Sequence, residues 1–391
     1  MVCVGIDVAK DKHDCCILDS DGMVRADCFT IPNNMDGFKQ LLQTIRNCTK
    51  KSDKIKVGLE ATGHYSYNIL GFLLDNGLPT YVINPLHTNL YRKSLSLRKT
   101  KTDRVDARTI ATMLLSDVDL KSYTDTAYHN EELKSLTRYR FDKVRERAKL
   151  KQSVSRLVTI LFPELEKLVP SLHSVSVYAL FSEYPGAKQI SEAHLTKLTN
   201  LLSIASKGHY GKEKAIQIRE AAKSSIGSVM PAKSLELKHT IKLIKELTSE
   251  IDEIEDSIQQ IMDELHPPIL SIPGVGIQSA AMILAEIGDF SNFESPDKIL
   301  AYAGCSPSTY QSGKLTNCYA HMEKRGSRYL RYALYNATKY VCHWNPVFAK
   351  YLAKKRAEGK HYNVALSHAT KKLVRLIYAL QKSGKAYLTA A

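Results

Sequence analysis

The chain has 391 residues, of which 55 are Lys or Arg and 40 are Asp or Glu, so its formal net charge is +15. A hydrophobic fraction of 44% at this length suffices for two or three packed domains and excludes a collagen, a disulfide-rich mini-protein and a mainly disordered chain. No apolar run approaches the roughly 18 residues of a membrane span, and the first residues lack the apolar core of a secretion signal. We therefore expect a cytoplasmic protein with no membrane partner.

The positive charge is concentrated in the last quarter of the chain. Residues 301–391 contain 16 basic and 2 acidic side chains, whereas residues 1–120 contain 16 and 14 and residues 121–300 contain 23 and 24. A field of this strength suits a polyanion, and nucleic acid is the leading candidate. The alternative is a solvated basic surface that has no specific partner.

The first 125 residues have the pattern of an α/β domain. Strands are predicted at 2–8, 13–19, 23–31, 55–60 and 79–84, and helices at 34–47, 65–76 and 103–116. Three consecutive strands followed by alternating helices and strands are typical of a ribonuclease-H-like sheet.

Four carboxylates fall at consistent places in that pattern. Asp7 lies on the first strand, and Glu60 lies at the carboxyl end of a later strand, where ligands collect in open α/β sheets. Asp103 and Asp106 are three residues apart at the start of a helix and therefore share one face. Hard oxygen donors of this kind suit one or two Mg²⁺ ions. Each acid alone has an ordinary alternative, such as a helix cap for Asp103.

The segment before Asp103 is basic. Its residues Arg98, Lys99 and Lys101 stand directly before the acidic pair. A basic approach to an acidic metal site fits a phosphodiester substrate, so we predict that these side chains contact nucleic acid. A plain surface loop is the alternative.

Residues 126–265 are predicted to be helical. Residues 131–162 contain no Gly or Pro, and their many basic side chains form either a solvated helix face or a nucleic-acid contact. Residues 237–265 carry apolar side chains at alternating spacings of three and four, which is the coiled-coil pattern. This helix could pair with residues 131–162 of the same chain or with another chain. A small helical insert is expected at about 170–233.

Residues 266–391 form a predicted small, mostly helical C-terminal domain. The PGVG segment within residues 269–288 resembles a helix-hairpin-helix, whose turn amides face a DNA phosphate, although a plain helical turn is the alternative. Ser312 follows in a polar, turn-rich stretch, where Gly313 gives room and Lys314 gives charge for a nucleophile. Downstream, four basic residues are predicted to open a helix in which tyrosines are interleaved, and this pattern suggests a nucleic-acid contact by Lys324, Arg325, Arg328 and Arg331.

Several motifs together resemble the signature of a known family. They are GIDVAK around Asp7, LEATG around Glu60, KTDRVDA around Asp103 and Asp106, and, further on, SIPGVG, LAYAGCSPSTYQSGK and KRGSRYLR. In this order they resemble the bacterial DEDD transposases of the insertion sequence 110 family, including its 1111 subgroup. The resemblance extends over the whole chain.

The resemblance implies a RuvC-like (ribonuclease-H-like) N-terminal domain, a coiled-coil helical middle and a small C-terminal transposase domain. Asp7, Glu60, Asp103 and Asp106 match the metal-binding acids, for which Mg²⁺ is expected, with Mn²⁺ able to substitute. Ser312 matches the serine that forms a covalent phosphoserine link to DNA. Related members are guided by a structured noncoding RNA that pairs with donor and target DNA. They assemble as tetramers, with composite sites built from the acids of one subunit and the serine of another, so we expect this chain to form a homo-oligomer, from dimer to tetramer.

The serine motif departs from the family pattern. Where the family often has Ser-Ser-Gly-Gly, this chain has Gln311, Ser312, Gly313 and Lys314. Ser306 and Ser308 are nearby alternative candidates for the nucleophile. The function expected from the resemblance is an RNA-guided DNA transposase of a bacterial mobile element, acting at the nucleoid. The alternatives are a RuvC-like nuclease that uses water, and a non-catalytic nucleic-acid scaffold.

Overall fold

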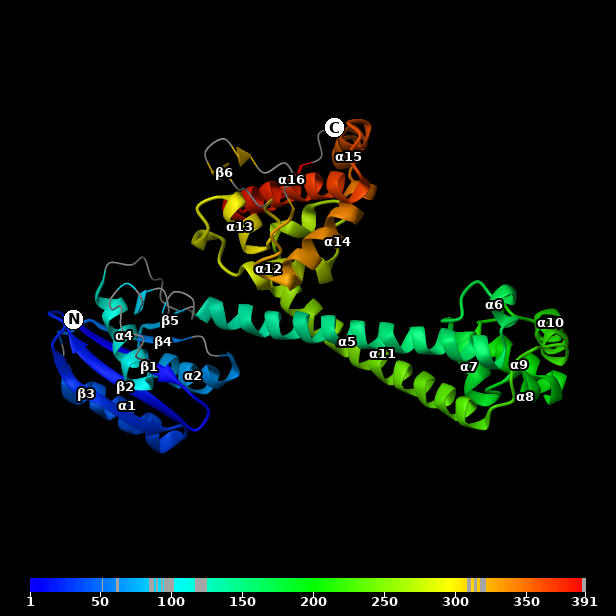
Figure 1. Cartoon of the computed structure of the whole chain (residues 1–391), viewed down its shortest axis with the longest axis horizontal. Helices are drawn as coiled ribbons and strands as arrows, with labels where there is room; N and C mark the ends of the chain where they lie inside the picture. The colour runs from blue at the N-terminus through cyan, green and yellow to red at the C-terminus, as the bar shows by residue number, and fades with distance from the viewer. Residues whose placement is uncertain are drawn as a thin grey trace. The chain divides into compact units, whose positions relative to one another are not determined.

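The computed structural model divides into two compact units, Met1–Ala127 and Tyr128–Ala391 (Figure 1). The structure describes residues 1–50, 52–60, 63–83, 88, 91–92, 94, 102–116, 125–307, 311–312, 315–316 and 321–388. The division of the second unit into 126–265 and 266–391 stays a prediction.

The first unit contains a five-stranded mixed sheet. Its strands are β1 (Val2–Val8), β2 (Lys12–Asp19), β3 (Val24–Pro32), β4 (Ile55–Glu60) and β5 (Thr80–Ile83), in the spatial order β3-β2-β1-β4-β5. The pairs β1–β2 and β2–β3 are antiparallel, whereas β1–β4 and β4–β5 are parallel. This arrangement confirms the predicted ribonuclease-H-like pattern.

Helices cover the two faces of this sheet with different packing. Helices α1 (Met35–Cys48) and α2 (Tyr67–Asp75), the latter after a 3₁₀ turn at Gly63–Ser66, share a core with alternate residues of β1 such as Val4 and Ile6. Helix α4 (Asp103–Leu115) packs on the opposite face, against Cys16 and Leu18 of β2. Because side chains alternate along a strand, the odd-numbered residues of β1 face α4.

Two glycines let α4 lie directly on the sheet. A Cβ atom at Gly5 would lie 2.1 Å from the carbonyl oxygen of Ala107, and one at Gly58 would lie 2.9 Å from Cγ2 of Ile110. Gly5 and Gly58 are partners in the parallel β1–β4 ladder. Any side chain at either position would push the helix away, so these glycines fix the distance between the start of α4 and the ends of both strands.

The second unit is built around two long antiparallel helices. Ion pairs join helix α5 (Asp125–Leu161) to helix α11 (Pro231–Leu265), and residues further along α5 pair with residues nearer the start of α11. Arg140 Nε donates to Glu255 Oε1 over 2.7 Å, and Arg156 NH2 lies 3.2 Å from Glu236 Oε1. Apolar side chains of both helices share the same cores. The predicted heptad seam therefore packs within the chain.

The seam drifts at its C-terminal end. Ile251 and Ile258 are buried as predicted, but Met262 takes the buried position at the end of the helix, while Leu265 is 46% exposed. A straight α-helix has about 3.6 residues per turn, whereas a heptad repeat corresponds to about 3.5, so the buried stripe shifts gradually around the helix relative to a strict heptad.

Between these helices lies a compact helical insert. It consists of α6 (Leu165–Leu168), α7 (Val175–Glu183), α8 (Ala187–Glu192), α9 (Leu195–Ala205) and α10 (Lys212–Lys223). Its apolar residues share a core with the end of α5 and the start of α11.

The rest of the second unit is mostly helical. Its elements are 3₁₀ turns at Pro268–Ser271 (η2) and Phe290–Asn292 (η3), helices α12 (Ile277–Ile287), α13 (Pro296–Tyr302), α14 (Arg328–Trp344), α15 (Pro346–Ala357) and α16 (Tyr362–Ser383), and the two-residue strands β6 (Gln311–Ser312) and β7 (Leu315–Thr316). Helices α12, α14 and α16 pack on a common core that also takes side chains from α5 and α11.

Candidate active site and nucleic-acid interface

The fold of the first unit gathers the four predicted acids at one edge of its sheet. Asp7 and Glu60 each lie two residues beyond the glycine pair Gly5–Gly58, so they occupy adjacent parallel strands on the face that α4 covers. Asp103 is the first residue of α4 and Asp106 lies in its first turn. Thr102 caps this helix by accepting a hydrogen bond from the backbone N–H of Val105, so the alternative role of Asp103 as the cap is wrong.

The acids at this edge influence one another electrostatically. Burial, followed by the negative charges of Asp106, Glu60 and Asp103, raises the pKa of Asp7 to about 7. Asp106 is 7% exposed, and its carboxylate oxygen Oδ1 accepts a 2.7 Å hydrogen bond from the Arg92 guanidinium. Negative charge is therefore concentrated at this edge.

The chemistry of these side chains fits a divalent cation. All four offer hard oxygen donors, and a cation would neutralise the charges of Asp106, Glu60 and Asp103 that, after burial, raise the pKa of Asp7. As the side chains stand, no three His, Cys, Asp or Glu residues in the described part of the chain lie close enough together to hold a metal ion. Closing such a site would require Asp106 to exchange Arg92 for the metal.

The pKa of Asp7 predicts a pH dependence of stability without metal. Between the ordinary aspartate pKa of about 4 and the folded value of about 7, the unfolded state is ionised while the folded state retains a proton, so the free energy of unfolding falls as pH rises. Thermal unfolding in EDTA at several pH values measures this dependence. The decrease in stability with rising pH should be smaller in Asp7→Asn, whereas it should be unchanged in Asp75→Asn, because Asp75 is exposed and serves as the control. Equal slopes in the two variants would contradict the assignment.

Ser312 lies on a small β-hairpin of the second unit. Its partner in the antiparallel β6–β7 pair is Leu315, so the serine backbone stands at the last pair before the turn. We call residues 307–322, which contain this hairpin, the serine-bearing segment. Its two ends form a stem, in which Pro307 pairs with Met322 through a β-bridge. Lys314 lies outside the described residues, as do Ser308, Arg98, Lys99 and Lys101.

The predicted basic residues of the second unit follow this stem. Lys324 and Arg325 do not open a helix as expected, because α14 begins at Arg328 with Ser327 as its N-cap. Lys324 has a positive φ of 55°, and its backbone N–H donates to the carbonyl of Gly304. Arg328 and Arg331 lie in the first turn of α14. The four side chains therefore share the region where the stem meets the helix.

Comparison with protein families decides the identity. A model of DEDD transposases of the IS110 type, described as "Transposase", matches residues 4–163, and a second, described as "Transposase IS116/IS110/IS902 family", matches residues 267–353. The chain belongs to the IS110 family of transposases. It is thus a DNA-binding enzyme of an insertion element that cleaves and transfers DNA strands.

Full-length relatives agree with this assignment. The transposase is 24% identical to the 44.8 kDa protein of insertion element IS116 from Streptomyces clavuligerus over 392 residues, covering 99% of this chain and 96% of the relative. It is 24% identical to the pilin gene-inverting protein of Moraxella bovis, covering 98% and 97%. It is also 24% identical to the transposase for insertion sequence element IS1111A of Coxiella burnetii, covering 86% and 76%.

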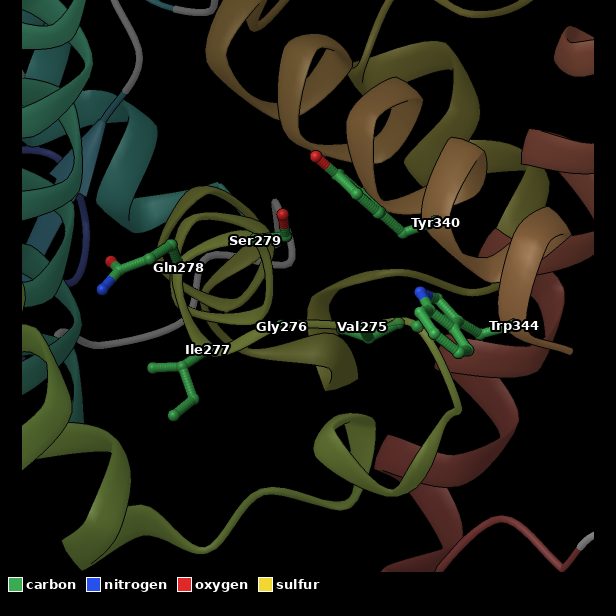
Figure 2. Close-up of a pocket in the computed structure, with 8 residues that line it drawn as sticks. Val275, Gly276, Ile277, Gln278, Ser279, Tyr340 and Trp344 are labelled. Carbon is green, nitrogen blue, oxygen red and sulfur yellow. The ribbon is translucent and has the colours of Figure 1, made fainter. Parts of the chain in front are cut away.

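The glycine-rich turn of the transposase lines a pocket of about 460 Å³ (Figure 2). Val275 and Gly276 lead into α12, whose N-terminal N–H groups have no side-chain cap, and Tyr340 and Trp344 approach from α14. The predicted helix before the turn is only the 3₁₀ turn η2, because Pro267, Pro268 and Pro273 restrict the backbone and Pro273 lacks an N–H donor. The resemblance to a helix-hairpin-helix is therefore confined to the turn and its second helix.

Two glycines of this turn should differ sharply in their tolerance of alanine. Gly274 has a φ of 93°, and a Cβ there would lie 2.5 Å from the Tyr340 carbonyl oxygen, whereas a Cβ at Gly276 would meet nothing within 4 Å. Gly274→Ala should lower the free energy of unfolding by about 1–3 kcal/mol or more, and Gly276→Ala should change it by less than about 0.5 kcal/mol. Denaturant unfolding checks this, and equal losses would contradict the described turn.

A buried ion pair that the sequence did not reveal anchors α14. Glu286 of α12 is 2% exposed and accepts hydrogen bonds from Arg138 Nε over 2.6 Å and from Ser327 Oγ over 2.5 Å. The Arg138 guanidinium also lies 4.7 Å from the Tyr329 ring centroid. Arg138 was predicted as either a solvated or a nucleic-acid-binding residue, but its side chain ties α5 through Glu286 to Ser327, the N-cap of α14. Only its mid-helix position in a basic run was visible in the sequence.

In the described part of the transposase, no helix combines the length and the apolarity that crossing a membrane requires.

Proposed function

We propose that this transposase cuts and rejoins DNA with a metal-bound acidic site and a serine nucleophile. The observation that carries the proposal is the gathering of Asp7, Glu60, Asp103 and Asp106 at one sheet edge, where burial and then the charges of the other three acids raise the pKa of Asp7. Acids with such charge density are stabilised by a divalent cation. The alternative function as a mere scaffold gives no reason for them.

In this proposal the four acids hold Mg²⁺, with Mn²⁺ able to replace it. The metal, when bound, polarises a phosphoryl oxygen and stabilises the charge that develops on it during strand cleavage. Asp7 and Glu60 are fixed by strands, whereas Asp103 and Asp106 are fixed by a helix that the glycine pair holds against the sheet. Rigid elements on both sides keep the donors in place.

Ser312 supplies the nucleophile in the proposed reaction. Its Oγ forms a bond to the phosphorus, the bond from phosphorus to the leaving sugar oxygen breaks, and the serine proton passes to that oxygen through solvent. A later attack by a sugar hydroxyl reverses these changes and rejoins a strand. The position of Ser312 at the end of β6, followed in the sequence by Gly313, supports this role, because a glycine adds no side chain that would obstruct an approaching DNA strand.

The partners in the proposal are the DNA of the element ends, the target DNA, a structured guide RNA and further copies of the chain, up to a tetramer. The guide and the oligomer follow from the family resemblance. The charge of the C-terminal quarter, with 16 basic and 2 acidic residues, supports contacts to phosphates. We propose a cytoplasmic location at the nucleoid, since the substrate lies there.

A denaturing gel tests this function. The full-length protein is incubated with labelled DNA of the element ends and target, with and without Mg²⁺ and the guide RNA. The proposal expects a metal-dependent protein–DNA adduct. Metal-dependent nicks without an adduct would favour the water-using nuclease instead, and intact DNA under all conditions would overturn both enzymatic readings.

A further inference from the structure

A second pocket of about 800 Å³ lies in the C-terminal part of the second unit. It is formed by α14, by α16 and by the stem of the serine-bearing segment. The described residues of its wall include no Asp or Glu. Five basic side chains line it, namely Lys324, Arg328, Arg331, Lys339 and Lys371. A concave site with five cations and no carboxylate favours an anionic ligand.

The cations of this pocket are partly positioned in advance. The Arg331 guanidinium donates to the Ala303 carbonyl over 2.8 Å, which holds its charge at the pocket wall. Lys339 and Lys371 make no ion pair with a carboxylate within the described part of the chain. Burial, followed by the charges of nearby lysines, lowers the pKa of His368 in the same wall, in keeping with a positive field. An anion would relieve this repulsion.

The pocket also offers contacts that a lone phosphate would not use. Tyr332 and Tyr335 line it from α14, and Tyr332 is 46% exposed. Asn363 and Ser367 line it from α16 and can hydrogen-bond a polar edge. Aromatic faces together with amide and hydroxyl groups match the face and the edge of a nucleobase.

The pocket adjoins the segment that carries Ser312. Pro307 and Met322, which pair to close the stem, both line it, as does Cys305, two residues before Pro307. The segment therefore leaves from and returns to the pocket wall. A nucleotide in the pocket would lie beside the base of the serine-bearing segment.

We propose that this pocket binds one unpaired nucleotide of a DNA or RNA strand, with its phosphate on the basic side chains and its base against the tyrosines. In a duplex the base is stacked and paired, so only an unpaired nucleotide can place its phosphate and its base in the pocket together. This inference rests on the proposed function, because it takes nucleic acid as the substrate.

Binding in EDTA tests the inference, since no strand is cut there. Fluorescence anisotropy of the full-length protein is measured with labelled single-stranded DNA, single-stranded RNA and duplex DNA. Tyr332→Ala and Lys371→Ala should each weaken single-strand binding about fivefold or more and change duplex binding less than about twofold. Lys371→Ala should also reduce the salt slope for single strands by about 0.7. The single strand, DNA or RNA, whose binding affinity falls more in these variants is the one that supplies the nucleotide.

Lys350→Ala is the matched control. It removes the same charge from an exposed position on α15 that does not line the pocket, and it should leave single-strand binding within about twofold. Lys339→Ala, at an exposed position of α14, provides a second variant if Lys371→Ala fails to fold. Equal losses for duplex and single strands, or for Lys350→Ala and the pocket variants, would overturn the inference. Such a result would leave the proposed function standing. Weaker single-strand binding by the pocket variants, together with no cleavage of DNA by the unaltered protein in Mg²⁺, would contradict only the proposed function.

Discussion

Asp7→Ala and Glu60→Ala are each expected to reduce metal-dependent strand cleavage by about a hundredfold or more. Each change removes a strand-held oxygen donor from the acidic edge, so the proposed cation would lose a ligand. Cleavage of labelled DNA at saturating Mg²⁺ measures the effect. The metal-dependent rise in thermal stability should vanish with it, which provides a readout independent of activity.

The matched control for these variants is Asp75→Ala. Asp75 is an exposed acid at the end of α2, so its removal should leave both cleavage and the metal-dependent stabilisation unchanged. Asp7→Ala should also fold at least as well as the unaltered protein without metal, because it removes a carboxylate that its neighbours repel. Normal cleavage by both Asp7→Ala and Glu60→Ala would make the metal-site proposal wrong.

Ser312→Ala is expected to abolish the covalent protein–DNA adduct, a loss of at least about a thousandfold. The change removes the proposed attacking oxygen and leaves the charge of the chain unaltered, so DNA binding and its salt dependence should remain near those of the unaltered protein. Quantified adduct bands on a denaturing gel, beside a binding titration, separate the two effects.

Ser306→Ala and Ser308→Ala serve as the comparison for Ser312→Ala. Ser306 accepts a backbone hydrogen bond from Glu323 in the stem, so its carbonyl has a structural role that does not depend on the hydroxyl. Both variants should keep the adduct. An adduct that persists in Ser312→Ala and disappears in one of the others would transfer the nucleophile to that residue.

The fold of the first unit was predictable because its signals are local. Alternating and continuous apolar runs marked the five strands, and the position of Asp7 and Glu60 near strand ends followed from the same pattern. The heptad spacing of residues 237–265 likewise identified a helix with one apolar face, but spacing could not reveal its partner. The ion pairs between Arg140 and Glu255 and between Arg156 and Glu236 decide in favour of α5.

Features that depend on distant residues could not be predicted in this way. Glu286 and Arg138 are 148 residues apart, and neither lies in a motif that demands the other. The close approach of α4 depends on Gly5 and Gly58, whose role appears only when the helix lies on them. The start of α14 was misplaced because Lys324 and Arg325 are compatible with a helix, whereas Gly326 with a φ of 101° and the cap at Ser327 set the boundary.

The most direct test of the proposed mechanism is to map the residue that is linked to DNA. The full-length protein is reacted with Mg²⁺, guide RNA and DNA, then digested with protease and nuclease, and the peptide that carries a nucleotide is sequenced by mass spectrometry. We predict the nucleotide on Ser312, and no linked peptide when Asp7→Ala is used. A nucleotide on another residue, or cleaved DNA without any linked peptide, would contradict the serine mechanism.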